Sequence, residues 1–469
     1  MSIHEECGIF GLYAPEPVRA AGTVYYGLYA LQHHGQGSCG ITVNDDGIFC
    51  THKDLGLVGD VFSEEELDRF PMGAMAIGHV RYGTTGRNDR RNCQPLEVNH
   101  QKGHMALAHN GNLTNAAQLR DVLELSGAIF HTTSDTEIIA YIITGERLRT
   151  SSIEEAVSRA MYRIDGAYSM ILMSPQKMIA VRDPYGFRPL CIGKTADGTW
   201  IAASESCALT AARAQWVRDV EPGEIVVFSK EGITSRREHC GTREKTLCAF
   251  EYIYFARPDS VIDSVPVSEA RFRAGRILAR TKPACADIVV GVPDSGLDAA
   301  AGFAEESGLP CRIGLVKNKY VGRTFIAPDG RDDKVHIKLA AVCAAVRGKR
   351  IVLIDDSIVR GTTSARIVSL LRDAGAREIH LRISSPPFLH PCYYGTDIDS
   401  EEHLIASHLS EEEIAKKVGA DSLGYLSPKD LPELAGSDRI CRVCFDGQYP
   451  TQIPADTRNE RFEQRLSER

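Results

Sequence analysis

The sequence lacks any uninterrupted apolar run near the ~20 residues that a membrane-spanning helix needs. Its opening residues, MSIHEEC, contain neither a basic stretch nor the apolar segment of a secretion signal. An excess of positive charge is missing too, because the formal net charge is −8, so no general attraction to nucleic acid or anionic lipid is expected. We therefore expect a cytoplasmic protein without nucleic-acid or membrane partners. Any anionic ligand would be held by cationic side chains and backbone N–H groups at its own site.

Internal repeats and low-complexity segments are also missing, which leaves ordinary globular domains. A chain of 469 residues exceeds what one hydrophobic core usually supports, so two domains are expected. The 43% apolar and 25% charged residues are typical of a globular protein and argue against a disordered or fibrous chain. Without an export signal, the 14 cysteines are expected to be thiols, ligands or nucleophiles rather than disulfides.

The two halves of the chain differ in their hydrophobic pattern. From Cys7 to Phe228 the apolar runs are short and glycine-punctuated, with helical segments near 118–127 and 152–161, which predicts a layered α+β domain. From Phe250 onward, wholly apolar strands alternate with helix-period segments, which predicts an α/β domain with a parallel sheet covered on both faces. The polar stretch 229–246 is the predicted linker.

Several residue types in the first half suit acyl transfer to a thiol. Taken alone, Cys7 is more simply interpreted as a buried strand cysteine. The segment AHNGNLTN adds Asn110 and Gly111 as possible donors to an oxyanion, although it could also be only a turn. Arg81 in GHVRYGTTG suits a carboxylate, and Asp135 in TTSDTE suits an α-ammonium group. The alternatives are a surface ion pair for Arg81 and a helix N-cap for Asp135.

The stretch KRIVLIDDSIVRGTTSARIV is the most specific signal in the second half. Paired carboxylates at the end of an apolar strand suit ribose hydroxyls with Mg²⁺ nearby, and a helix N-terminus beyond them suits a phosphate. A plain strand, turn and helix would not explain two adjacent aspartates at the ligand-binding end of a parallel sheet. The residues concerned are Asp355, Asp356, Arg360, Gly361, Thr362 and Thr363.

Two further segments of the second half carry polar or basic side chains. GVPDSGLDAA places Ser295 after another apolar strand. The segments LVKNKYVGRTFIAPDGR and VHIKL carry Lys317, Arg323 and Lys338, which could fold over a pyrophosphate and exclude water. A basic loop is more often simply solvated, so this interpretation depends on the neighbouring motifs.

The motifs of the first half resemble, in order, those of the N-terminal-nucleophile (Ntn) glutaminases. DDSIVRGTTS resembles the phosphoribosyl pyrophosphate motif of type I phosphoribosyltransferases. Together with the junction CAFEYIYFARPDS, they make the chain similar to the glutamine phosphoribosylpyrophosphate amidotransferase family from Cys7 to about Pro450. The resemblance implies a propeptide at 1–6, an Ntn glutaminase domain at 7–235, and a phosphoribosyltransferase domain with a C-terminal tail at 250–450.

This resemblance also implies roles for the motif residues. Removal of the propeptide would leave Cys7 with its own α-amino group as general base for the thiol. Asn110 and Gly111 would form the oxyanion hole, and Arg81 and Asp135 would bind glutamine. The motif residues of the second half would bind phosphoribosyl pyrophosphate, with Mg²⁺ held near Ser295, Asp355 and Asp356. The ammonia released would displace pyrophosphate to give 5-phosphoribosylamine and open purine synthesis.

The late cysteines have a spacing that several kinds of site share. Cys441 and Cys444 in C-x₂-C spacing could by themselves be half a zinc site, a redox pair, or neither. In the iron–sulfur branch of the family, ligands come from contexts matching Cys248, Cys392, Cys441 and Cys444, which implies a [4Fe–4S] cluster. Zinc is the alternative occupant, and Cys240 is the rival of Cys248.

The chain departs from the family pattern at two positions. His34 in LQHHGQ stands where the family usually has arginine, and Ala340 stands where asparagine is common. Members are usually homo-oligomers, tetramers or dimers, inhibited by purine nucleotides, which the resemblance extends to this chain. Competing hypotheses are a sugar-isomerising or asparagine-forming amidotransferase, against which DDSIVRGTTS argues, and a phosphoribosyl pyrophosphate sensor, for which no basic recognition helix is found.

Overall fold

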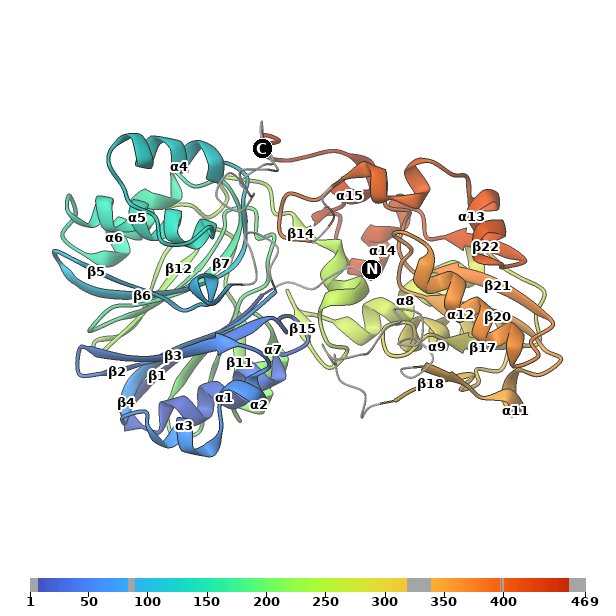
Figure 1. Cartoon of the computed structure of the whole chain (residues 1–469), viewed down its shortest axis with the longest axis horizontal. Coiled ribbons are helices and arrows are strands. Elements are labelled where there is room, and N and C mark those ends of the chain that lie inside the picture. The colour runs from blue at the N-terminus through green and yellow to red at the C-terminus, as the bar shows by residue number, and fades with distance from the viewer. Residues whose placement is uncertain (1–6, 83–88, 319–338, 397, 399, 455–469) are drawn as a thin grey trace, which may run out of the picture.

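The chain forms two domains that lie side by side (Figure 1). The computed structural model describes residues 7–82, 89–318, 339–396, 398 and 400–454. The predicted propeptide and the basic residues Arg323 and Lys338 lie outside these ranges. Within them, no helix has both the length and the apolar composition that crossing a membrane would require.

Two antiparallel sheets make up the N-terminal domain. The first sheet has seven strands in the order β11-β9-β10-β1-β4-β2-β3, and the second has six in the order β13-β12-β8-β7-β6-β5. The strands of the first sheet are β1 (Gly8–Val18), β2 (Ser38–Asp45), β3 (Ile48–Leu55), β4 (Gly73–Arg81), β9 (Cys191–Lys194), β10 (Trp200–Ala203) and β11 (Gln215–Asp219). Those of the second are β5 (Leu96–His100), β6 (Gly103–Leu113), β7 (Gly166–Met173), β8 (Met178–Arg182), β12 (Ile225–Ser229) and β13 (Gly232–Arg236).

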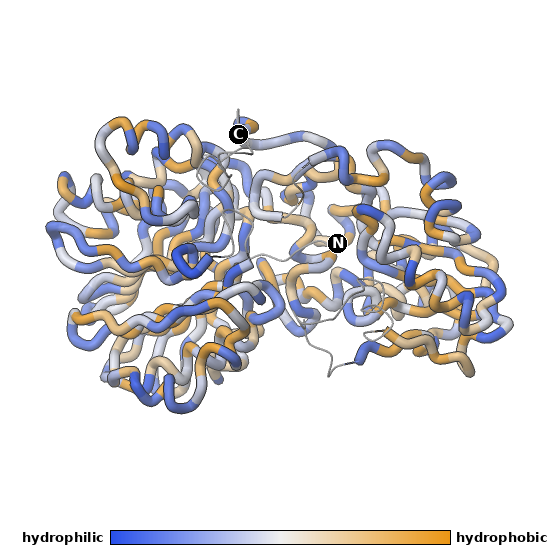
Figure 2. Tube along the Cα trace, in the orientation of Figure 1, coloured by the Kyte–Doolittle hydropathy of each residue, from blue (hydrophilic) through white to orange (hydrophobic). Residues whose placement is uncertain are grey.

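Helices cover the outer faces of both sheets, which gives four layers (Figure 1). The helices on the first sheet are α1 (Ala20–Ala30), α2 (Val58–Val61), α3 (Glu64–Asp68) and α7 (Ser206–Ala211). Those on the second are α4 (Ala116–Leu125), α5 (Asp135–Arg147) and α6 (Ile153–Met161). Ile9 belongs to the core between the sheets, whereas Phe10 belongs to the core beneath α1. Because such strands are buried on both faces, they are continuously apolar in sequence (Figure 2).

Both helices predicted in the first half are confirmed, as α4 and α6. The predicted linker 229–246 needs correction, because it contains β13, the edge strand that pairs with β12. An edge strand has solvent on much of its surface, so β13 carries polar side chains and looks like a linker in sequence.

The C-terminal domain is built on a four-stranded parallel sheet in the order β17-β20-β21-β22. These strands are β17 (Ile288–Gly291), β20 (Arg350–Asp355), β21 (Glu378–Ile383) and β22 (Ser422–Tyr425). In β20, Val352 and Ile354 pack into the core with the helices α8 (Val267–Thr281) and α9 (Leu297–Ser307). Ile351 and Leu353 pack into the other core, with α12 (Thr362–Asp373) and α13 (Glu411–Val418). The predicted parallel sheet with two covered faces is therefore confirmed.

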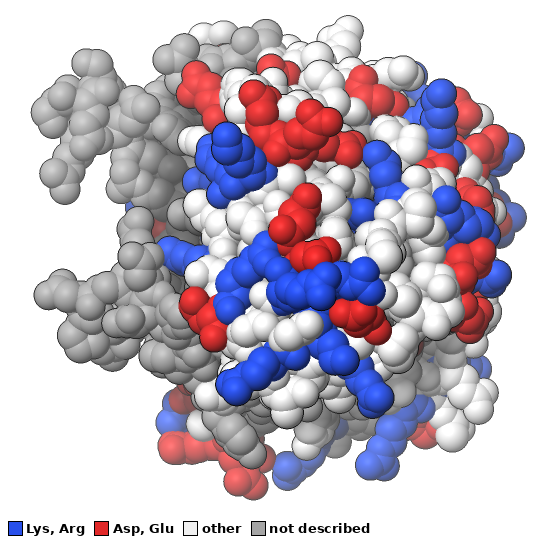
Figure 3. Space-filling model, turned by 90° about the vertical axis from the view of Figure 1, so that its right-hand side faces the viewer, with Lys and Arg blue, Asp and Glu red and all other residues white. Residues whose placement is uncertain are grey.

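Shorter elements complete this domain and its border. The strands are β14 (Leu247–Cys248), β15 (Val261–Ile262), β16 (Val265–Pro266), β18 (Leu315–Lys317), β19 (Leu339–Ala341) and β23 (Ile440–Cys441). The short helices are η2 (Glu251–Phe255), α11 (Cys343–Val346), α14 (Leu431–Ala435) and α15 (Val443–Asp446). Figure 3 views the end of this domain that faces away from the N-terminal domain, where acidic and basic side chains lie side by side. This face therefore presents no field of one sign.

Buried charges join the two domains. Arg182 at the end of β8 donates to both carboxylate oxygens of Asp263, at 2.9 and 3.1 Å. Arg188 donates to Glu251 at 3.2 Å and to the carbonyl of Tyr394 at 2.6 Å. Both guanidinium groups are inaccessible to solvent. Although burial opposes ionisation, Arg182 and Lys245 hold the pKa of Asp263 at about 2. These pairs hold the domains in one relative orientation.

We expect Asp263→Asn to lower the free energy of unfolding by roughly 3–5 kcal/mol, because it leaves the charge of Arg182 buried without its counter-ion. The matched control is Asp68→Asn, whose partner Arg19 is 84% exposed. An exposed pair of this kind contributes about 0–1 kcal/mol. Urea unfolding of both variants measures the difference, and equal losses would contradict the structural role of the buried pair.

Candidate functional site

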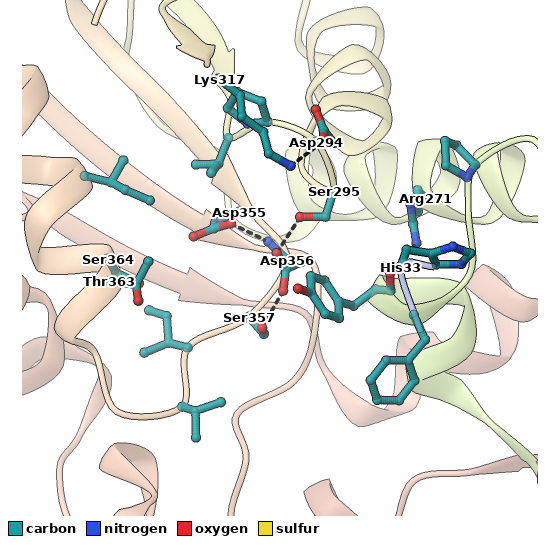
Figure 4. Close-up of a pocket in the computed structure, with 18 of the residues that line it drawn as sticks. His33, Arg271, Asp294, Ser295, Lys317, Asp355, Asp356, Ser357, Thr363 and Ser364 are labelled. Atoms are coloured by element: carbon teal, nitrogen blue, oxygen red, sulfur yellow. Dashed lines mark hydrogen bonds and ion pairs between the residues drawn. The ribbon is translucent and has the colours of Figure 1, made fainter. Parts of the chain in front are cut away.

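One cavity of about 780 Å³ lies at the carboxyl ends of the parallel strands, where the two domains meet. The motif residues predicted in the second half line it, apart from those outside the described ranges. His33 of the N-terminal domain lines it as well, and Figure 4 shows this ring across the cavity from Thr363 and Ser364. The site is therefore shared between the domains.

Asp355 and Asp356 form the floor of this cavity. Asp355 ends β20, and its carboxylate accepts the backbone N–H of Asp356 at 3.0 Å. Burial and the neighbouring carboxylate of Asp356 raise the pKa of Asp355 well above its usual value. A cation bound here would displace a proton, so its affinity should rise with pH.

Ser295 and Lys317 reach the same cavity from other strand ends. The hydroxyl of Ser295 donates to Asp356 Oδ1 at 2.6 Å, and the hydroxyl of Ser357 donates to the other oxygen (Figure 4). Lys317, at the end of β18, forms an ion pair of 2.7 Å with Asp294. Hydroxyl and carboxylate oxygens are the ligand types that Mg²⁺ prefers, so the set fits this ion.

The N-terminus of α12 faces the cavity and can bind a phosphate. Gly361 caps the helix at φ 77°, a left-handed conformation that favours glycine. Thr362, Thr363 and Arg360 line the cavity around it. The first backbone N–H groups of a helix have no intrahelical acceptor and bind anions well.

Arg271 and His33 line the cavity but were not predicted from the sequence. Arg271 lies on α8 and is buried, and its guanidinium donates to the carbonyls of Tyr252, Tyr254 and Ala256 at 2.6–2.9 Å. It thereby holds the cavity wall formed by η2. Nothing local in the sequence around Arg271 signals this, whereas His33 lies within the LQHHGQ motif already recognised.

In the N-terminal domain, Cys7 and Arg81 are close together. Cys7 precedes β1 and is buried, and its thiol donates to the carbonyl of Tyr82 at 3.6 Å. β1 pairs with β4, with Gly8 opposite Val80, so Arg81 comes from the adjacent strand. Arg81 is 3% exposed, which excludes the alternative of a surface ion pair. Gly35 lies against the same strand, because a Cβ there would be 2.4 Å from the carbonyl carbon of Val80.

Asn110 and Gly111 lie in β6, so this segment is a strand rather than a turn. Gly111 has φ 139°, and a Cβ there would be 2.1 Å from the carbonyl oxygen of Ala167, so only glycine fits. The side-chain oxygen of Asn110 is buried and has no hydrogen-bond partner among the described residues. Buried polar atoms are nearly always hydrogen-bonded, so this oxygen is an exception within the region.

Asp135 shares this region with the residues above. It is buried at the start of α5, and Ser134 rather than Asp135 caps the helix. Its carboxylate accepts the N–H of Leu113 at 3.0 Å. Although burial opposes ionisation, His109, the Leu113 amide and Arg81 hold the pKa of Asp135 below its usual value. The structure thus places a buried carboxylate and a buried guanidinium in one electrostatic neighbourhood.

A hydrogen bond between the two sheets connects these groups. Burial lowers the pKa of His79 to about 3, so its neutral ring can donate from Nε2 to the carbonyl of His109 at 3.0 Å. His79 lies opposite Ile9 in β1, and His109 precedes Asn110 in β6. The strand that follows Cys7 and the strand that carries Asn110 are therefore linked.

The structure also brings the four predicted cysteine ligands into one region. β14 pairs with β23 in parallel, with Cys248 opposite Cys441. Burial raises the pKa of Cys444 well above its usual value, and Cys392, Cys248 and Cys441 raise it further. Cys240, by contrast, is surrounded by Glu221, Glu224, Arg237 and Glu238.

The spacing of these thiols bears on what they could hold. In a tetrahedral zinc site, bonds of about 2.3 Å bring the sulfurs within about 4 Å of one another. Among the described residues, no three of these cysteines have their sulfurs within 4.8 Å of one another. The thiols thus share a region without the close spacing of a single-ion site.

Together, the fold and site define a glutamine amidotransferase joined to a phosphoribosyltransferase. Residues 80–211 match the family described as "Glutamine amidotransferase domain". The chain is 47% identical to the amidophosphoribosyltransferase of Methanocaldococcus jannaschii, over 95% of this chain and 98% of that one. It is 46% identical to the Bacillus subtilis amidophosphoribosyltransferase, over 97% and 96% of the two chains.

Solved structures agree with these sequence relatives. The B. subtilis glutamine phosphoribosylpyrophosphate amidotransferase, complexed with ADP and GMP, is similar with a TM-score of 0.89, 45% identity and coverage of 96% of this chain and 99% of that one. The chain belongs to the amidophosphoribosyltransferase family. It catalyses the first step of purine biosynthesis, in which glutamine supplies the nitrogen of 5-phosphoribosylamine and pyrophosphate leaves phosphoribosyl pyrophosphate. The sugar-isomerising, asparagine-forming and sensor hypotheses are thereby excluded.

We expect Asp356→Asn to lower the pKa of Asp355, because the second negative charge is removed while the shape of the side chain is kept. Burial should still hold that pKa above the ordinary value. Carboxyl ¹³C NMR across a pH series measures the shift, with Asp294→Asn as control. An unchanged Asp355 pKa in Asp356→Asn would contradict the interaction between the two carboxylates.

Proposed function

We propose that Cys7 releases ammonia from glutamine and that the shared cavity binds the phosphoribosyl pyrophosphate that consumes it. The observation that carries this proposal is the cavity itself, which Asp355, Asp356 and Ser295 line together with His33. His33 lies two residues before Gly35, which packs on β4 beside the start of β1. The same turn therefore borders both sites, and ammonia formed at one is released close to the other.

In the glutaminase site, we assign each residue a role that suits its charge or its hydrogen-bonding groups. Removal of residues 1–6 gives Cys7 an α-amino group that takes the proton of its thiol. Arg81 binds the carboxylate of glutamine, and Asp135 binds its ammonium group. Asn110 and Gly111 donate hydrogen bonds to the oxyanion of the tetrahedral intermediate. The low pKa of Asp135 supports its role, because only the ionised form attracts a cation.

In the cavity, we assign the paired aspartates to the ribose hydroxyls and the N-terminus of α12, with Arg360, Gly361, Thr362 and Thr363, to the 5′-phosphate. Lys317 can exchange its exposed ion pair with Asp294 for the pyrophosphate. Ser295, Asp355 and Asp356 would hold Mg²⁺, which supplies positive charge for the departing pyrophosphate. Arg323 and Lys338 remain proposed pyrophosphate ligands from outside the described residues.

We expect Cys7→Ala to reduce the glutamine-dependent activity on the order of 10³-fold or more, because the nucleophile is gone. Activity with ammonium salts should stay within about twofold, since the phosphoribosyltransferase site is intact. Pyrophosphate release with each nitrogen donor measures both, and Cys207→Ala is the matched control. Loss of both activities would point to misfolding, and retention of both would show that another group attacks glutamine.

For the cysteines, we propose a [4Fe–4S] cluster held by Cys248, Cys392, Cys441 and Cys444. Burial raises the pKa of Cys441 to about 12, so this thiol would lose its proton only to a strongly positive group such as iron. Four irons separate the sulfurs more widely than one zinc ion does, which suits the spacing described above. The cluster would be structural, tying β14 at the domain border to β23 near the C-terminus.

Anaerobically purified protein is expected to contain about four iron and four sulfide ions per chain. Cys444→Ser should lose them and melt at a lower temperature, whereas Cys240→Ser should keep them. Metal analysis and visible absorption measure both variants. One zinc ion per chain in place of iron would contradict the cluster.

We also propose that the chain is a cytoplasmic homo-oligomer, a dimer or tetramer, inhibited by purine nucleotides. The support for nucleotide inhibition is the B. subtilis relative, whose structure was solved in complex with ADP and GMP. The location and the oligomeric state rest on the family resemblance alone.

A further inference from the structure

Two adjacent histidines and one glutamate form a cluster beside the cavity, and only His33 among them also lines it. Among the described residues, His33, His34 and Glu205 are the one set of three or more histidine, cysteine or acidic residues with ligand atoms all within 4.8 Å of one another. The Nε2 atoms of His33 and His34 lie 2.8 and 2.5 Å from the same oxygen of Glu205. Glu205 is buried at the start of α7, and the histidines follow α1.

The hydrogen bonds of His33 show that a positive charge belongs between this ring and Glu205. Its Nδ1 lies 3.1 Å from the carbonyl oxygen of Ala30, which can only accept, so Nδ1 carries a hydrogen. A neutral ring would then present a lone pair to Glu205. An ionised Glu205 carboxylate, whose other oxygen accepts the backbone N–H of Arg257 and the hydroxyl of Ser260, likewise only accepts. Nε2 of His33 and the oxygen of Glu205 are then two acceptors, and they can lie this close only if a second proton or a metal ion lies between them.

We propose that His33, His34 and Glu205 bind a divalent transition-metal ion of the Zn²⁺ type. Two imidazole nitrogens and one carboxylate oxygen are an established protein ligand set for zinc, which leaves a fourth position for water or substrate. The site depends on His34, because an arginine at this position has no lone pair to offer a metal.

The groups around the cluster match the outer shell of a metal site. Metal-binding histidines commonly donate their second N–H to a backbone carbonyl, as His33 does to Ala30. The other oxygen of Glu205 accepts the N–H of Arg257 at 2.8 Å and the hydroxyl of Ser260 at 2.5 Å. These contacts orient both ligands before any ion arrives.

The cavity provides the entry path. The side chain of His33 is 25% exposed and borders the cavity, whereas those of His34 and Glu205 are 4% and 0% exposed. An ion there would bind the turn of the N-terminal domain and Glu205, which already accepts hydrogen bonds from Arg257 and Ser260 of the C-terminal domain. Imidazole ligands favour Zn²⁺ and Co²⁺ over Mg²⁺, which prefers oxygen, so Mg²⁺ at the aspartates would not compete.

The test is a Co²⁺ and Zn²⁺ titration of the full-length protein with its cysteine site loaded and Mg²⁺ in excess. Wild type is expected to bind one more ion per chain than His34→Arg and His33→Ala, each of which should weaken this binding at least tenfold. His408→Ala, which removes an exposed histidine elsewhere, should bind as wild type does. Because the ligands are nitrogen and oxygen, bound Co²⁺ should lack the intense charge-transfer absorption of thiolate coordination.

The same titration can overturn the proposal. Equal stoichiometry and affinity in wild type and His34→Arg would show that the cluster holds only protons. Loss of the ion in His34→Arg but not in His33→Ala would overturn the ligand set. Urea midpoints of all variants identify any that lose the ion through unfolding, and Glu205→Gln is compared only if its midpoint is near that of wild type.

Discussion

The contact between the two domains depends on charges that are buried and neutralised across the junction. Arg182 and Arg188 of the N-terminal domain have no access to solvent, and Asp263 and Glu251 of the other domain supply the matching charges. Separating the domains would remove the counter-ions of two buried guanidinium groups, or would require water to enter and hydrate them. This constraint holds the LQHHGQ turn against the carboxyl ends of the parallel strands.

That placement explains how two chemistries can share one chain. A parallel sheet binds ligands at the carboxyl ends of its strands, and this edge faces the N-terminal domain here. Arg271 holds one wall of the cavity in place, because it donates to three backbone carbonyls in and around η2.

One departure of this chain from its family pattern, His34, changes the chemistry that this turn can support. Histidine in place of arginine at position 34 removes a permanent positive charge and supplies a ring nitrogen that can bind a metal. His33 and Glu205 have their own ligand atoms within 4.8 Å of it. The four later cysteines differ from this cluster in spacing, because no three of their sulfurs, among the described residues, lie as close together as the ligand atoms of the histidine cluster. They also differ in chemistry, because thiolates are soft ligands whereas imidazole and carboxylate groups are harder. The two sets would therefore select different occupants.

The sequence by itself determined the two-domain organisation, the layered and parallel-sheet classes, and the family, because strand and helix periods and short motifs are local properties. It also identified Cys7, the paired aspartates and the four cysteines as candidates. It misjudged residues 229–246, since a solvated edge strand has the composition of a linker. Only the tertiary structure decided that His33 borders the cavity, that Arg271 holds its wall and that Glu205 meets both histidines. Segments far apart in the chain meet there through packing, and no local spacing encodes such meetings.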